Sequence, residues 1–167
     1  METKFIMPFM TSIKNVFGTM LKTKVTFGAP SLKQQGQVSH GVSGIISFTG
    51  SVSGNIVVSL PLEVAAEAIR RFASIVLPPD HPDFIDAIGE LVNMIAGGAK
   101  ASFGREDVAI SCPSVVMGHD HQLFQRKDQA VVVVPCQSEA GAFVTEIGLK
   151  VSQPAAKAGA ELAGAAR

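Results

Sequence analysis

Hydrophobic side chains recur at three- and four-residue intervals in three segments of this chain, residues 8–21, 61–77 and 80–103. This spacing places them on one face of an α-helix, because successive helical residues are rotated by about 100°. The pattern is longest in residues 80–103. The chain is therefore predicted to contain three amphipathic helices, each of which buries one face.

Prolines and glycines indicate where these helices begin and end. Leu77-Pro78-Pro79 is predicted to stop the second helix, because proline cannot continue the hydrogen-bond ladder. Asp80 is predicted to cap the third helix, with Pro82 in its first turn. Gly104 is predicted to terminate it.

Runs of β-branched and apolar residues predict five strands. Residues 38–48 and 55–60 flank a polar, glycine-rich segment and are typical of a hairpin, and three more runs follow at 108–117, 130–136 and 142–151. Gly41 and Gly44 in the first strand indicate either a bulge or a close approach of another segment. The predicted fold class is α+β, a mainly antiparallel sheet with the helices packed on one face, in the order α-β-β-α-α-β-β-β.

The composition is typical of a globular protein and argues against some classes of partner. The chain has 167 residues, of which 47% are hydrophobic, and a net charge of zero. This predicts one domain over residues 1–152, followed by a flexible Ala/Gly-rich tail at 153–167. Balanced charge argues against nucleic acid, and no apolar run reaches the roughly 18 residues that span a bilayer. We expect a cytoplasmic protein in which Cys112 and Cys136 are buried, reduced thiols.

Fragments that resemble catalytic or metal sites lack the context that such sites need. The segment Gly97–Ser102 lies inside a predicted helix and does not match a phosphate-binding loop. His119 and His121 have no companion cluster and are expected to be solvated, and His40 and His81 show no triad partners. No metal site and no nucleophile are predicted.

One face of the third helix is polar, and we call it the polar stripe. It consists of Asp86, Glu90, Asn93, Gly97 and Lys100, whereas the apolar residues opposite it are Phe84, Ile88, Leu91, Val92, Ile95 and Ala99. The stripe is either ordinary solvated surface or a site for a partner. Asn and two adjacent glycines are poor helix formers, and three of them within six residues indicate a helix that accommodates something close to its surface.

Residues 86–97 resemble the D-x-x-x-E-x-x-N-x-x-x-G helix of the CheC/CheX/FliY chemotaxis phosphatases. The segment Pro113-Ser114-Val115-Val116-Met117-Gly118, the hairpin and Pro8-Phe9 are similar to the CheX branch, which also carries a single E-x-x-N. The likeness extends from about residue 8 to residue 151.

This resemblance implies a phosphatase that hydrolyses the aspartyl phosphate of a CheY-like response regulator. Asn93 would orient the attacking water and Glu90 would pair with the regulator's lysine, while Asp86, Gly97 and Lys100 would contact the partner. The chain itself would bind no cofactor, because Mg²⁺ belongs to the regulator's active site. The family also implies a homodimer formed by strand exchange or edge pairing. A regulator-binding adapter without catalysis and a motor-associated scaffold remain as alternatives.

Overall fold

The computed structural model describes residues 5–34, 36–37, 39–123 and 129–152. The tail predicted over 153–167 lies outside the described residues, so the domain limit at residue 152 stays a prediction. In chain order the elements are α1 (Met7–Met20), β1 (Val25–Phe27), β2 (Ser31–Leu32), β3 (Val42–Thr49), β4 (Val52–Leu60), α2 (Leu62–Ala73), α3 (Pro82–Ser102), β5 (Ala109–Ile110), β6 (Ser114–Met117), β7 (Val132–Ser138) and β8 (Gly141–Val151).

The strands of the described part form one sheet in the order β1-β7-β8-β4-β3-β5, with β2 also beside β7 and β6 also beside β3. All of these pairings are antiparallel. The predicted hairpin is β3–β4, in which Val42 pairs with Leu60 and Phe48 with Gly54. The α+β class with a mainly antiparallel sheet is therefore confirmed.

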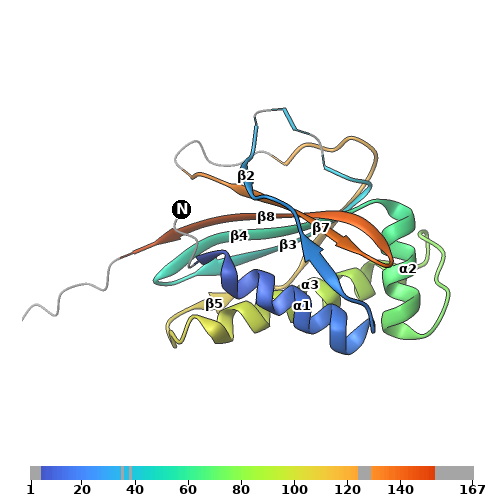
Figure 1. The fold of residues 1–167 in the computed structure, drawn as a ribbon, viewed down its shortest axis with the longest axis horizontal. Coiled ribbons are helices and arrows are strands. Elements are labelled where there is room, and N and C mark those ends of the chain that lie inside the picture. The colour runs from blue at the N-terminus through green and yellow to red at the C-terminus, as the bar shows by residue number, and fades with distance from the viewer. Residues whose placement is uncertain (1–4, 35, 38, 124–128, 153–167) are drawn as a thin grey trace, which may run out of the picture.

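The helices pack against one face of this sheet and enclose the hydrophobic core. Figure 1 shows α1 and α3 beneath the sheet, with α2 at one end. The ring of Phe9 from α1 meets those of Phe48 and Phe103 edge to face, and Phe17 stacks on Phe143 of β8. None of the helices in the described residues has both the length and the apolar character needed to cross a membrane.

The opposite face of the sheet is covered by connecting segments that hold a buried ion pair. Glu146 of β8 lies between Val57 of β4 and Val133 of β7, so these three side chains share a face. The Lys33 ammonium, just after β2, lies 2.6 Å from the Glu146 carboxylate, and both side chains are almost fully buried. Lys33 also donates to the carbonyl of Leu123. One lysine therefore fastens two covering segments to the sheet.

Several element boundaries differ from the predictions for local reasons. The strand predicted over 108–117 divides into β5 and β6 around Pro113, which cannot donate to a ladder. The short β1 and β2 were not predicted, because two or three residues carry no readable pattern. α2 ends at Ala73, where Ser74 adopts a left-handed conformation with φ 58°, so Ile75 is 50% exposed.

Two further predictions are corrected. The α3 cap is His81 and not Asp80, because the His81 ring nitrogen accepts a hydrogen bond from the Asp83 N–H. Cys112 is exposed, because it lies in the connection between β5 and β6 at the sheet edge, whereas Cys136 is buried as predicted. Burial raises the pKa of the Cys136 thiol to about 11.

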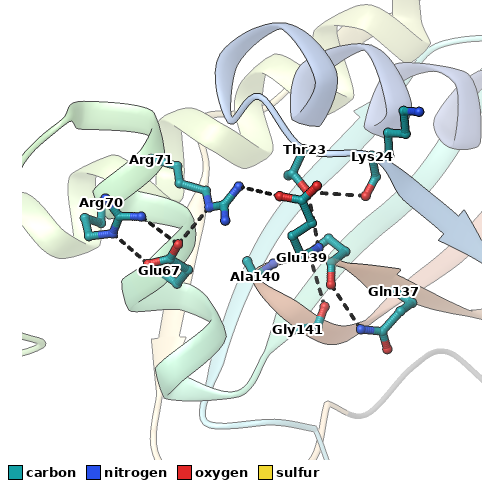
Figure 2. Close-up of polar contacts among 10 residues, drawn as sticks. Thr23, Lys24, Glu67, Arg70, Arg71, Gln137, Glu139, Ala140 and Gly141 are labelled. Atoms are coloured by element: carbon teal, nitrogen blue, oxygen red, sulfur yellow. Dashed lines mark hydrogen bonds and ion pairs between the residues drawn. The ribbon is translucent and has the colours of Figure 1, made fainter.

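An ion-pair network joins α2 to the turn between β7 and β8 (Figure 2). Glu67 accepts hydrogen bonds from Arg70 and Arg71, which lie three and four residues further along α2. Arg71 also reaches Glu139, whose backbone N–H donates to Thr23. Hydrogen bonds from the two arginines lower the pKa of Glu67 from 4.5 to about 2.

This lowered pKa predicts a pH-dependent contribution of Glu67 to stability. A carboxyl group that is more acidic when folded contributes stability above its unfolded pKa and loses it as the pH falls towards its folded pKa. Glu67→Gln should therefore be less stable than the parent at neutral pH, with the difference shrinking between pH 4.5 and about 2. Chemical denaturation across this range measures the effect. A difference that stays constant over the range would contradict the assignment.

Candidate functional site: the polar face of helix α3

α3 buries the face that was predicted to be buried and exposes the polar stripe. Each of the six predicted apolar residues, from Phe84 at the start of the helix to Ala99 near its end, is at most 1% exposed. In the stripe, Asp86 and Glu90 are exposed, and Asn93, Gly97 and Lys100 are half-buried. The five predicted site residues therefore lie on one accessible face of a helix anchored in the core.

Two glycines allow α3 to approach the sheet and the β5–β6 connection closely. A Cβ atom at Gly44 of β3 would lie 2.5 Å from a methyl carbon of Val92, and one at Gly89 would lie 3.2 Å from the Pro113 ring. Gly44 pairs in register with both neighbouring strands, so it serves a close approach and not a bulge. These contacts involve residues beside Asn93 and Glu90, and they set the height of the polar stripe above the sheet.

A third contact joins α3 to α1. The Ser12 hydroxyl of α1 donates a 2.7 Å hydrogen bond to the backbone carbonyl of Ile95. A Cβ atom at Gly98 would collide with the Ser12 hydroxyl oxygen, so a side chain at this position would have to displace Ser12. By contrast, a Cβ atom at Gly97 would meet nothing within 4 Å. Adjacent glycines thus serve different purposes, one for packing and one for an open surface.

Glu90 and Asn93 are free to bind a partner. Three residues of helix separate their Cα atoms by a rise of about 4.5 Å. Among the described residues, neither the Glu90 carboxylate nor the Asn93 carboxamide has a hydrogen-bond or ion-pair partner. A carboxamide can donate and accept simultaneously without titrating, so it can hold a water molecule in a fixed orientation.

An open hollow of about 650 Å³ lies at the carboxyl end of the polar stripe. It is lined by Gly97, Lys100, Ala101, Gly104, Arg105, Glu106 and Ile110, and we call it the α3 hollow. The structure thus places two predicted site residues, Gly97 and Lys100, beside Arg105 and Ile110, which were not among the predicted site residues. The sequence does show a second cation, Arg105, directly after Gly104. Only the fold shows that Ile110 of β5 also lines the hollow.

His119 and His121 were both predicted to be solvated, and the structure confirms this for His119 only. His119 is exposed, but His121 is half-buried, with its Nδ1 atom 2.9 Å from the Gly118 carbonyl and its Nε2 atom 2.8 Å from the Ser43 hydroxyl. Because a carbonyl only accepts, Nδ1 is the donor in its contact with Gly118. Within the described residues, no three His, Cys, Asp or Glu side chains are grouped to hold a metal ion.

Comparison with known proteins agrees with this architecture. Residues 42–137, more than half of the chain, match the family described as Chemotaxis phosphatase CheX. The chain is 30% identical over 112 residues to the CheY-P phosphatase CheX of Thermotoga maritima, covering 65% of this chain and 70% of that protein.

Solved structures show the same fold. A CheC-like superfamily protein from Shewanella sp. PV-4 superimposes with a TM-score of 0.80 at 28% identity, covering 90% of this chain and 99% of the other. The CheX of the CheX–CheY–BeF₃–Mg²⁺ complex from Borrelia burgdorferi has a TM-score of 0.71 at 22% identity, with coverages of 87% and 97%. The protein is thus of the CheC-like class. Within that class, the chain belongs to the CheX family of chemotaxis phosphatases.

The two adjacent glycines of α3 provide a matched test of how the helix is held. Gly97→Ala should stabilise the protein by about 0.8–1 kcal/mol, because alanine is the better helix former and the space is open. Gly98→Ala should instead destabilise it by about 1 kcal/mol or more, because overpacking against Ser12 outweighs that gain.

Urea denaturation of both variants measures these free energies. In a Ser12→Ala background the cost of Gly98→Ala should fall, since the colliding oxygen is gone and the remaining Ser12 Cβ lies 3.2 Å away. Equal effects of the two substitutions in the parent would show that the α1–α3 contact does not limit the packing.

Proposed function

We propose that this protein hydrolyses the aspartyl phosphate of a CheY-like response regulator, with Asn93 orienting the attacking water and Glu90 pairing with the regulator's lysine. Membership in a phosphatase family supports the reaction class. The 30% identical relative carries the name CheY-P phosphatase, which supports the substrate. The observation that carries the residue assignment is an exposed acid and a half-buried amide, one helical turn apart on the accessible face of α3 and without polar partners among the described residues.

In this proposal Asn93 aligns the attacking water with the phosphoryl group. Phosphoryl transfer depends mainly on an in-line arrangement of the attacking and leaving oxygens and on charge stabilisation around the phosphoryl group. In this proposal the regulator's Mg²⁺ and lysine supply the charge, and a water-binding carboxamide on α3 supplies the alignment. The reaction then requires no general base on this chain, and an acyl phosphate is reactive enough for one well-placed amide to suffice.

The remaining stripe residues are assigned to the interface. Glu90 would neutralise the regulator's lysine and fix the orientation of the two proteins. Asp86 and Lys100 would contact the regulator on either side of the site, and Gly97 would permit a close approach because nothing occupies the space above it. A regulator-binding adapter would use the same contacts without accelerating hydrolysis, so measured phosphate decay separates the two functions.

Replacing Asn93 tests the catalytic assignment. Asn93→Ala should reduce acceleration of phosphate loss by a factor on the order of 10² or more, because removal of a single preorganised donor typically has this effect. Complex formation should be largely preserved. The measurement uses a panel of purified CheY-like regulators phosphorylated with acetyl phosphate in Mg²⁺, with and without this protein. A variant that accelerates phosphate loss like the parent would remove Asn93 from the mechanism, and a parent that accelerates none would contradict the function.

Replacing Glu90 tests docking separately from alignment. Glu90→Lys should raise KM for the phosphorylated regulator far more than it lowers kcat, because the substitution puts a like charge opposite the regulator's lysine. Glu63→Lys, at an exposed position on α2, is the charge-matched control and should leave KM unchanged. Equal KM values for Glu90→Lys and its control would show that Glu90 makes no such pair.

A further inference from the structure

The α3 hollow is shaped to receive a side chain from outside the molecule. Gly97 and Gly104 line it, and a Cβ atom at either position would meet no atom within 4 Å. Gly104 has φ +60°, so the turn after α3 both needs glycine and leaves this space unfilled. Ala101 is exposed in the same wall, and Ile110 of β5 provides an apolar surface continuous with the core. Small residues and one aliphatic side chain thus form an apolar recess.

The rim of the hollow is cationic. Lys100 and Arg105 line it, and among the described residues neither has an ion-pair partner. Glu106 is the single acid in the lining. At the other end of the polar stripe lie Asp86 and Glu90. The accessible face of α3 is therefore polarised, acidic towards its amino end and basic at its carboxyl end, with Asn93 between them.

A partner docked on Asn93 would cover this hollow. A standard protein interface buries about 800 Å² per partner, which corresponds to a disc with a radius of about 16 Å. Asn93 and Lys100 are two turns apart on one side of the helix, a rise of about 10 Å. Both ends of the charge pattern are thus inside one footprint. Complementarity requires a cation of the partner opposite Glu90 and an anion opposite Lys100 and Arg105.

We propose that the α3 hollow is a docking pocket for the phosphorylated response regulator, receiving an apolar side chain flanked by a carboxylate from a segment beside the regulator's phosphorylation site. This inference rests on the proposed function and extends it to Arg105, Ala101 and Ile110. The hollow orients the regulator along α3 and selects among regulators. It does not touch the reacting atoms, so its residues are specificity residues and not catalytic residues.

Charge reversal at the rim is the first test. The double variant Lys100→Glu/Arg105→Glu should raise KM for the phosphorylated regulator about tenfold, which is the lower end of the range of electrostatic effects on association rates. It should change kcat by less than about twofold. The KM of the parent should rise with salt, and this dependence should be weaker in the double variant, which keeps the Glu90 pair but lacks the cations of the rim. Lys24→Glu/Lys150→Glu makes the same change in net charge at two exposed positions outside the hollow and should leave KM unchanged.

Filling the recess is the second test. Ala101→Trp occupies the hollow without changing charge and should raise KM while preserving kcat and the thermal unfolding temperature. Each variant should also be made in an Asn93→Ala background, and its equilibrium binding to the regulator loaded with Mg²⁺ and BeF₃ should be measured. The variants with the highest KM should then bind this regulator most weakly. This readout does not require turnover.

The outcomes separate this inference from the proposed function. Unchanged KM and affinity for the rim and recess variants, together with loss of activity in Asn93→Ala, would overturn the docking pocket and leave the phosphatase assignment intact. Unchanged KM with an altered sedimentation coefficient would assign the hollow to a second copy of this chain and would likewise overturn it. Failure of the parent to accelerate phosphate loss would contradict the function itself.

Discussion

The close packing of α3 at three points is the constraint on which the site depends. Val92 fits over Gly44 of the sheet, Gly89 lies against Pro113, and Gly98 admits Ser12 of α1. A larger residue at Gly44 or Gly98 would collide with a neighbouring side chain, and one at Gly89 would crowd the Pro113 ring. Protein interiors are close-packed, so such changes are resisted. The rotation and height of α3 are therefore determined from three directions. The apolar face of α3 is buried against the sheet and α1, so its polar stripe faces outward.

This arrangement explains how an ordinary-looking helix surface can serve a reaction. In the proposed function the protein contributes no metal, no nucleophile and no enclosed cleft, and its active site is complete only in the complex. What the chain must supply is a rigid position for one amide to within a fraction of an ångström. A helix embedded in a core provides that rigidity better than a loop would. Among the described residues Glu90 and Asn93 have no polar partner, so no bond to this part of the chain has to break when a regulator binds.

In the proposed complex, the charges along α3 affect both how tightly the regulator binds and which way round it docks. Acidic residues at one end and basic residues at the other allow only one direction of docking for a partner with matching polarity. Exposed charges contribute little stability as single pairs, but they influence encounter rates and selectivity between partners. The ion pairs that do support the fold lie elsewhere, at Lys33–Glu146 and in the Glu67 network. In the proposed complex, the charges that contact the regulator are thus separate from those that support the fold.

The amino-acid sequence by itself determined the three helices, the main strands and the composition of the polar stripe, because helix and strand periodicities are local properties of the chain. It also indicated the family, through a motif on the third helix and further similar segments from about residue 8 to residue 151. Only the tertiary structure decided between a bulge and a close approach at Gly44, divided one predicted strand at Pro113, and moved Cys112 to the surface. It likewise placed Arg105 and Ile110 beside Gly97 and Lys100 to form the hollow. These features depend on contacts between segments far apart in the chain. A local pattern of hydrophobic residues predicts helices and strands, but it does not predict which of them will be in contact.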